Sequence, residues 1–568
     1  MSTLKPTSNQ EAIQPRRDRG RATLLVLVCL WGLSFVAVWA DRTTSVRHQR
    51  IGVRFADGTT DDVRRQVEQA VGLVDAEQQG PATWGYRMVR PTRERVIRLV
   101  QNPAVADTNH IERQAFRVEL DRPDLYPWMR YLLEVLPGRA LAIAFPLVTL
   151  LLTVAGRRQV APLLVRGLDR AGLRPGHGAA LAVTLLVLII AFFVFADNEP
   201  RWDERAHWRQ IELFVRRDWS MEPSITTLPG YHALIALAAW FMGNARLPSV
   251  RLVQFEIALA TIVAFFFLAR RRDPAWATPK TLQFVFLPLL FPLFFMIYTD
   301  VASLGFVLLT ALAASAGRYP ASGVLGLAAC LVRQNNIVWV ALAFTQGYVA
   351  DHGWRWPSRV STLLRYAPVL LSAVVIAGWL AFNRGQVAAG DVKAHPLGTP
   401  HLGNVFFMLF LAGILFLPLW WGYRKETWDR LRRPAMWAVL AVTLALFWFG
   451  FAADHPYNEE SGFVRNQILM WATATRTHSL IFFLPIAVAC LSLPSVRLAR
   501  AGWLVYPATV AFLLPSWLIE QRYYLIPLAL LLADREPVDA PVEWAQVGYS
   551  AILSVVAFVV VERGTWML

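Results

Sequence analysis

The sequence is short of charged residues and of cysteine, and both shortages limit what the chain can be. Only 17% of its 568 residues are charged, whereas a soluble domain carries about a quarter. The three cysteines, Cys29, Cys330 and Cys490, lie in apolar runs and offer neither a disulfide framework nor the spacing of metal ligands. An ordinary soluble protein is therefore not expected, and the redox compartment stays undetermined.

Long apolar runs take the place of the missing charge. Hydrophobic residues make up 55% of the chain, and uncharged runs such as 179–196 and 435–453 approach the roughly 20 residues that a helix needs to cross a bilayer. The formal net charge of +16 comes mainly from short loops between such runs, where basic residues set topology, so nucleic acid is not an expected partner. We therefore predict an all-α polytopic membrane protein.

The N-terminal part is expected to contain two spans on either side of one polar domain. Residues 1–21 form a basic tail, which the positive-inside rule places in the cytoplasm. The apolar run 22–40 is too long for the core of a cleaved signal peptide and is interpreted as an uncleaved transmembrane anchor. A second span at 139–156 brings the chain back to the cytoplasm.

Residues 41–130 differ from the rest of the chain because they are polar. Alternating apolar residues predict strands, and apolar residues at helical spacing predict a helix with Thr59 or Thr60 as its N-cap. The expected elements are strands at 51–55, near 84–89 and at 116–120, and helices at 63–71 and 92–101. This pattern predicts a small α+β domain on the outer face, without a catalytic constellation.

The apolar runs within residues 179–561 predict a multi-span core of about a dozen crossings, in which 231–243 and 251–269 together make one net crossing. The recurring basic loops are expected to be cytoplasmic: 270–272, 355–365, 424–433 and 497–500. The stretches between them then face outward: 298–300, 333–336, 383–401, 454–476 and 520–522. Charged side chains at membrane depth are costly and usually serve function, so their collection on one face indicates a site there.

The outer loop 197–228 contains the richest polar segment, from Arg201 to His207. Asp203 and His207 are four residues apart and would share one face of a helix, with Glu204 beside them. A carboxylate placed there could take the proton from an attacking hydroxyl, as a general base does. The same pattern also fits an interfacial amphipathic helix whose charges only face water.

The residues that follow favour the catalytic interpretation. The segment resembles the endoplasmic-reticulum α-1,2-glucosyltransferases that add the last glucose to the lipid-linked oligosaccharide, which belong to the GT-C superfamily of membrane glycosyltransferases. The loop matches the family's pattern at Asp203, Glu204, His207, Trp219, Ile225, Thr226, Thr227, Pro229 and Gly230. Further motifs follow in the family's order: Tyr298-Thr299-Asp300, Arg333 to Trp339, Gly390 to His395, His455-Pro456-Tyr457 and Glu520 to Tyr523. Each motif alone is weak, but six in order are specific, and the resemblance covers residues 197–533.

The resemblance implies a GT-C-like bundle that transfers a hexose, with glucose as the family's sugar, from a polyprenyl-phosphate donor to a glycan, lipid-linked or protein acceptor. It implies transfer on the non-cytoplasmic face with inversion at the anomeric carbon. We expect a bacterial inner membrane with a periplasmic site or, in a eukaryote, the endoplasmic-reticulum membrane. A transporter or flippase of polyprenyl-linked sugars and an inactive scaffold are the alternatives. The sequence shows no metal-ligand cluster, although a divalent ion stays open because some members of the superfamily use one.

The matched residues imply individual roles. Asp203 is expected to be the general base with Glu204 as its closest competitor, and Asp300 either orients acceptor or base or caps the following helix. Donor-phosphate contacts are expected from Arg333, Gln334, Lys393, His395 and Arg522. Acceptor or sugar contacts are expected from His207, Trp219, Thr226, Thr227, Asp391, His455 and Arg465. Exposed loop positions are an equal alternative for Lys393 and His395, and the departure from the family's pattern between Tyr457 and Asn466 leaves the acceptor open.

Overall fold

The computed structural model divides the chain into two compact units, Met1–Ala171 and Gly172–Leu568, and each is described by itself. The described residues are 51–78, 82–88, 98–99, 102–109, Met567, and 175–564 without 244, 356–359, 386–387, 391–398, 461 and 499–500. The basic tail 1–21, the expected spans 22–40 and 139–156 and the expected strand 116–120 lie outside the described residues.

The described part of the first unit is a four-stranded antiparallel sheet with a helix. Its elements are β1 (Ile51–Phe55), α2 (Asp61–Val71), β2 (Leu73–Gln78), β3 (Thr83–Met88) and β4 (Val105–Asn109), with strand order β2-β3-β1-β4. Thr60 caps α2 by accepting a hydrogen bond from the Val63 amide, and Val67 and Val71 pack on Val53 and Phe55 of the sheet. The predicted α+β character and the predicted elements at 51–55, 63–71 and 84–89 are confirmed, whereas β2 and β4 were not predicted.

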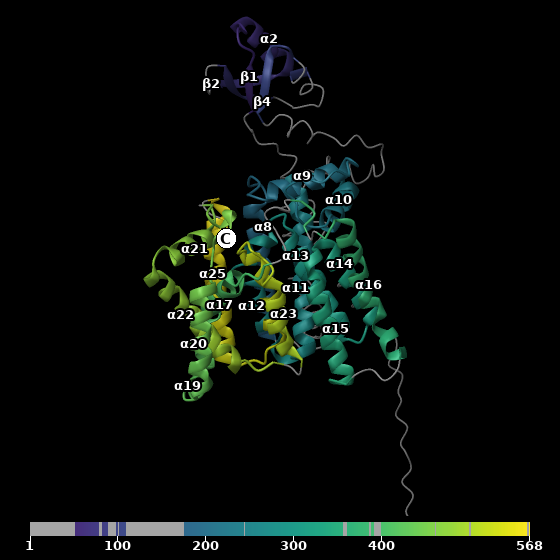
Figure 1. Cartoon of the computed structure of the whole chain (residues 1–568). Coiled ribbons are helices and arrows are strands. Elements are labelled where there is room, and N and C mark those ends of the chain that lie inside the picture. Colours follow the sequence, from purple (N-terminus) through teal and green to yellow (C-terminus); the bar gives the residue numbers. More distant parts are fainter. Residues whose placement is uncertain are drawn as a thin grey trace, which may run out of the picture. The chain divides into compact units, whose positions relative to one another are not determined.

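The second unit is built from helices, as predicted (Figure 1). Its first half contains α8 (Pro175–Phe195), α9 (Glu204–Val215), α10 (Gly230–Met242), α11 (Leu247–Arg272), α12 (Ala277–Val285), α13 (Thr299–Ser315), α14 (Tyr319–Val332), α15 (Ile337–His352) and α16 (Val360–Phe382). Its second half contains α17 (Gly403–Leu415), α18 (Leu417–Gly422), α19 (Arg424–Leu431), α20 (Pro434–Gly450), α21 (Val464–Ala474), α22 (Arg476–Ser492), α23 (Val505–Leu513), α24 (Leu525–Asp534) and α25 (Ala540–Glu562). Short 3₁₀ turns that matter for the site are η3 (Gln334–Asn336), η5 (Pro456–Asn458) and η8 (Gln521–Tyr524).

Several helices have the length and composition of membrane spans. Among the described residues these are α11, α22 with its extension to Ser495, and α25, and α19 with α20 makes a fourth if this pair, bent by 95°, counts as one span. Seven shorter apolar helices of 10–17 residues accompany them, including α10, α13 and α14. The chain is a multi-pass membrane protein, but among its described residues only α11, α22 and α25, or four spans with the α19–α20 pair, are long and apolar enough to cross a bilayer alone, fewer than the dozen or more crossings predicted for the whole chain.

The difference arises because some long apolar runs do not form one straight helix. Residues 281–298 carry no charge, yet α12 ends at Val285 and a 3₁₀ turn occupies Phe291–Phe294. Pro288 and Pro292 lie in this break, and proline removes a backbone donor and clashes with the preceding helical turn. Likewise, α10 has only 13 residues while α11 has 26, which fits the expectation that these two segments make one crossing.

The loops that carry the sequence motifs are fixed by close helix packing. A Cβ on Gly230 would lie 2.5 Å from the carbonyl oxygen of Leu331, so the first turn of α10 can pack on the last turn of α14 only without a side chain there. This contact sets the loop before α10 beside η3. Figure 1 shows α9 lying across one end of the bundle, with the basic helix α19 at the opposite end.

A separate buried ion-pair network joins α12, α24 and α25. Arg535 donates from Nη1 to Oε1 of Glu543 at 2.7 Å and from Nη2 to Oε2 at 2.5 Å, and both residues are at most 2% exposed. The side chain of Gln283 donates to Glu543 and accepts from Arg535, and Lys280 donates to the Arg535 carbonyl. Because these contacts pair the buried charges of Arg535 and Glu543 and hold three helices together, we interpret the network as structural.

Candidate active site

Three carboxylates and three guanidiniums form one connected network at the loop ends of the helices. The carboxylates belong to Asp203, Asp300 and Glu520, and the guanidiniums to Arg333, Arg465 and Arg522. Residues more than 300 positions apart in the sequence thereby meet, because Arg522 contacts Asp203 across the fold. The predicted base and the two preferred phosphate ligands are therefore brought together.

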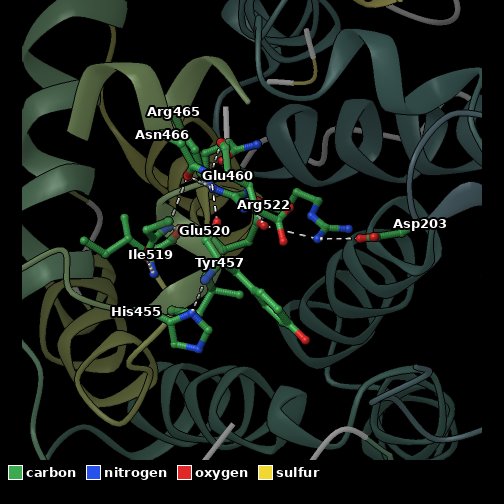
Figure 2. Close-up of polar contacts among 12 residues, drawn as sticks. Asp203, His455, Tyr457, Glu460, Arg465, Asn466, Ile519, Glu520 and Arg522 are labelled. Carbon is green, nitrogen blue, oxygen red and sulfur yellow. Dashed lines mark hydrogen bonds and ion pairs between the residues drawn. The ribbon is translucent and has the colours of Figure 1, made fainter. Parts of the chain in front are cut away.

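Arg522 is the hub of this network. Its Nη2 lies 3.1 Å from Oδ2 of Asp203 and 3.1 Å from Oε2 of Glu520, and its Nη1 lies 3.9 Å from Oδ2 of Asp300. Figure 2 shows Arg522 between Asp203 on one side and Glu520 with Arg465 on the other. Although burial by itself would lower the pKa of Arg522, the three carboxylates raise it well above the ordinary value, so the guanidinium stays charged.

Arg333 and Asp300 form a two-point ion pair beside this hub. Arg333 reaches Oδ1 of Asp300 from Nη1 at 2.9 Å and Oδ2 from Nη2 at 3.2 Å, while its Nε donates to Thr299 Oγ1 at 2.9 Å. Asp300 lies in the first turn of α13, but its carboxylate is committed to guanidiniums, so the expected acceptor-orienting or capping role gives way to holding Arg333 and Arg522.

A small pocket opens where the two arginines meet. Both guanidinium side chains are 14% exposed. The pocket is lined by Asp300, Ser303, Arg333, Asn336, Phe512, Arg522, Tyr523, Leu525 and Ile526. One side is thus cationic and hydrogen-bonding, and the other is apolar, which is the chemistry of a site for a phosphate on a hydrocarbon chain.

Asp203 is the network carboxylate that faces outward. Its side chain is 53% exposed, whereas those of Asp300 and Glu520 are 1% and 2% exposed. The preceding residue, Trp202, has a φ of 42°, a left-handed conformation that is costly for a residue with a bulky side chain. After this turn the carboxylate of Asp203 is exposed to solvent, whereas that of the adjacent Glu204 is buried.

Glu204 is completely buried and its two oxygens are occupied. Oε1 accepts from Arg251 Nε at 2.9 Å and from the Ile297 amide at 3.0 Å, and Oε2 accepts from Arg251 Nη2 at 2.7 Å and from the Arg201 amide at 3.0 Å. Arg251, also 0% exposed, donates further to the carbonyls of Phe195, Ala196 and Asn198. This geometry argues against Glu204 as the alternative base, because the hydroxyl of a glycan acceptor cannot reach the buried carboxylate. We assign Glu204 a structural role in fixing the turn.

His207 lies beneath this turn. It is 8% exposed, and its Nδ1 is 2.9 Å from Nε2 of His232. Burial, with a smaller effect from the Arg522 and Arg333 guanidiniums, lowers the pKa of His207 to about 3, so the ring is neutral at physiological pH. Its ring packs against Tyr298, and the placement favours a structural role over the expected contact with acceptor or sugar.

Of the expected contact residues Thr226, Thr227 and Gln334, the first and last join two loops of the protein to each other, while the buried Thr227 hydroxyl has no hydrogen-bond partner among the described residues. Gln334 donates from Nε2 to the Thr226 carbonyl at 2.9 Å, and its Oε1 accepts from the Leu228 amide at 3.3 Å. The Thr226 carbonyl also accepts a hydrogen bond from the Ala389 amide, so Ala389 lies beside this loop. Asp391, Lys393 and His395, expected to contact donor or acceptor, lie outside the described residues.

Two further expected acceptor contacts point into the protein. His455 is 1% exposed, accepts from the Tyr457 amide at 3.0 Å and packs edge-on against Trp517. Arg465 is 5% exposed and pairs with Glu520. By contrast, Trp219 is 73% exposed at the protein surface, next to Phe214.

Two residues of the site were not given roles by the sequence patterns. Glu520 stands inside a matched motif, and Arg251 lies at the edge of an apolar run that reads as a span. A lone arginine at such a position indicates an acidic partner elsewhere in the fold, because a charge at membrane depth needs a partner. Among the described residues, no three His, Cys, Asp or Glu side chains are grouped as a metal site requires.

Comparison with known proteins supplies the family context for this geometry. The Rattus norvegicus protein named Dol-P-Glc:Glc(2)Man(9)GlcNAc(2)-PP-Dol alpha-1,2-glucosyltransferase is 24% identical over 422 residues, covering 61% of this chain and 87% of the relative. The Drosophila melanogaster protein of the same name is 25% identical over 406 residues, covering 63% of this chain and 89% of the relative. The names of these relatives give no support to the transporter alternative.

The crystal structure of ArnT from Cupriavidus metallidurans in the apo state aligns with 67% of this chain and 77% of that chain, at 15% identity and a TM-score of 0.35, which is too low to carry an argument. The model of the DIE2/ALG10 family matches residues 197–359, a range that contains the first three of the sequence motifs. The predicted resemblance to this family is therefore confirmed by the family model and by the similarity to the named relatives.

Proposed function

We propose that this chain is a membrane glycosyltransferase that moves glucose from a polyprenyl-phosphate donor to a hydroxyl of a glycan acceptor. The observation that carries the proposal is the exposed carboxylate of Asp203 beside a pocket lined by Arg333 and Arg522. The names of the relatives support the sugar and the donor class, since they specify Dol-P-Glc and an alpha-1,2-glucosyltransferase.

Inverting transfer assigns a task to each side of this arrangement. Asp203 accepts the proton of the acceptor hydroxyl while that oxygen forms a bond to the anomeric carbon. The bond between that carbon and the phosphate oxygen breaks in the same step, and its electron pair leaves with the phosphate. Arg333 and Arg522 then stabilise the added negative charge on the departing polyprenyl phosphate.

The apolar wall of the pocket supports a lipid-linked donor rather than a soluble sugar nucleotide. Phe512, Leu525 and Ile526 line it together with the two guanidiniums. Phe512 belongs to α23, and Leu525 and Ile526 begin α24. A hydrocarbon chain can therefore continue from the phosphate along apolar surface.

We place this site on the non-cytoplasmic face, in a periplasmic or lumenal compartment. Basic residues gather at the end of the bundle away from α9, on α19 and on the last turn of α11, as the positive-inside rule requires for cytoplasmic loops. The acceptor is proposed to be a glycan on a lipid carrier or on another envelope molecule, and the bacterial inner membrane is the proposed location.

Replacing Arg333 with lysine tests the phosphate assignment. Lysine keeps the charge beside Asp300 but loses the planar fork that grips two oxygens at once. The Michaelis constant for the donor is expected to rise by about 10-fold, or 1.4 kcal/mol, which is within the range of one charge-assisted hydrogen bond.

The measurement is steady-state transfer by Arg333→Lys in proteoliposomes. Arg209→Lys is the matched control. Arg209 lies on α9, at the same end of the bundle, and its exposed side chain forms an ion pair with Glu222. An unchanged donor KM in Arg333→Lys would remove Arg333 from the donor site.

The proposed function itself is tested with a panel of polyprenyl-phosphate hexoses and lipid-linked glycan acceptors. Purified protein in proteoliposomes is expected to release polyprenyl phosphate and to form a glycan one glucose longer. Movement of the intact donor between leaflets without a new glycosidic bond would instead support a transporter. Absence of both activities across the panel, with folded protein, would overturn the proposal.

A further inference from the structure

Within the part of the chain that the structure describes, every guanidinium of the network that is proposed to receive the donor already has a carboxylate partner. Each of the three guanidiniums already contacts a carboxylate: Arg333 contacts Asp300, Arg465 contacts Glu520, and Arg522 contacts Asp203 and Glu520. A sugar phosphate adds a negative charge to this balanced set. A phosphate that approaches a guanidinium edge already in use competes with the carboxylate bound there.

Exposure shows which carboxylate can give up its guanidinium. Asp203 is 53% exposed and can exchange its ion pair for water, whereas Asp300 and Glu520 are at most 2% exposed. An exposed ion pair contributes little to stability, whereas breaking a buried ion pair is strongly destabilising. The Asp203–Arg522 contact is therefore the one that a phosphate replaces.

Glu520 is built to hold Arg522 in place during that exchange. Its Oε2 contacts Arg522 at 3.1 Å and also pairs with Arg465. Burial raises the pKa of Glu520, but the guanidiniums of Arg465 and Arg522 outweigh burial and lower it to about 2, so the carboxylate stays ionised.

The backbone that carries Glu520 is anchored on both sides. Asn404 accepts from the Glu520 amide at 3.2 Å, and Asn458 bonds both the amide and the carbonyl of Ile519 at 3.1 and 2.9 Å. Arg465, in turn, donates from Nε to Asn466 at 3.1 Å. Figure 2 shows Arg465, Asn466 and Ile519 on the side of Glu520 that is away from Asp203.

We propose that Glu520, backed by Arg465, is a positioning residue that keeps the Arg522 guanidinium between Asp203 and the phosphate pocket, so that a donor phosphate replaces Asp203 as the partner of Arg522. Donor binding thereby frees Asp203 for the acceptor proton, and the same guanidinium then stabilises the leaving phosphate. This inference rests on the proposed function and adds to it an order of events: the base is released only when a donor is present.

The first test shortens the side chain of Glu520 and leaves its charge. Glu520→Asp withdraws the carboxylate by one methylene, so it cannot contact Arg465 and Arg522 together, and turnover is expected to fall ~10²-fold, as for other small misplacements near a reacting centre. The loss is expected mainly in kcat, because Arg522 acts most strongly on the leaving group. Glu543→Asp makes the same change in the equally buried Arg535–Glu543 pair and controls for general destabilisation.

Both variants are compared per folded molecule, with melting temperature measured beside kcat and KM. If Glu520→Asp keeps turnover within the range of Glu543→Asp, the positioning role is wrong. Wild-type turnover in the same experiment separates this result from failure of the proposed function, in which no protein would transfer glucose.

The second test measures binding alone, with polyprenyl monophosphate as the probe. Asp203→Asn removes the competing charge from Arg522, so the probe is expected to bind about 2–5-fold more tightly than to wild type, the equivalent of an exposed ion pair. Unchanged or weaker probe binding by folded Asp203→Asn would overturn the exchange. This readout does not depend on turnover, which Asp203→Asn is expected to lack.

Discussion

Asp203→Asn is expected to reduce glucose transfer by about 10²–10⁴-fold, the range that a positioned general base contributes. Asparagine has nearly the same shape and can still accept the hydrogen bond from Arg522, but it cannot take the acceptor proton. Because the side chain is 53% exposed, the change is not expected to unfold the protein. Initial rates of transfer in proteoliposomes, at saturating donor and acceptor, measure the effect.

Asp218→Asn is the matched control for this substitution. Asp218 is exposed shortly after the end of α9 within the same segment 197–228, and its Oδ1 accepts a hydrogen bond from the Ser220 amide at 3.0 Å, which an asparagine oxygen can also accept. Asp218→Asn is expected to transfer glucose at the wild-type rate. Equal activity of Asp203→Asn and Asp218→Asn would exclude Asp203 as the base.

Glu204→Gln is expected to lower the stability of the folded protein and not the rate of glucose transfer. The substitution leaves the charge of Arg251 uncompensated at a position with no exposure, and breaking a buried pair in this way costs about 3–5 kcal/mol. We expect a strongly reduced yield of folded protein and a lower melting temperature. The protein that does fold should retain most of its turnover per molecule.

A double substitution separates this account from a catalytic role. Glu204→Gln with Arg251→Met removes both charges and should recover part of the lost stability, because two charges leave together. Activity per folded molecule is again the measurement. A stable Glu204→Gln protein without turnover would restore Glu204 as a candidate base.

Sequence reasoning recovered the partners of the site but could not distinguish two adjacent carboxylates. Asp203 and Glu204 are neighbours in one motif, and helical spacing gives both a place near His207. What separates them is the left-handed turn at Trp202 and the arrival of Arg251 from α11, both of which depend on tertiary packing. Helical spacing carries no information about such long-range contacts.

The same limit explains the roles of Arg465 and His455. Polar residues in an outward loop suggested contact with an acceptor, but both side chains are buried among residues of the Glu520 loop. A motif shows that a residue is constrained, whereas only the fold shows whether it faces substrate or supports another side chain. The prediction that Arg333 and Arg522 belong to the site was possible because an arginine among other polar residues is unusual near a membrane span.

The overall architecture could be predicted from the sequence more reliably than the number of membrane crossings. Low charge and long apolar runs indicated a helical membrane protein, and alternation at 51–55 with the cap at Thr60 indicated the small α+β unit. The crossings could not be counted reliably, because Pro288 and Pro292 interrupt one run and the bend between α19 and α20 breaks another.

The most direct test of the central claim is the anomeric configuration of the product formed by purified wild-type protein from a β-linked polyprenyl-phosphate glucose. Single displacement with Asp203 as base predicts an α-linked glucose on the acceptor, determined by NMR spectroscopy of the isolated glycan, and a strongly reduced amount of this product from Asp203→Asn. A β-linked product would require a second displacement and a nucleophile on the protein, and it would contradict the mechanism proposed for this site.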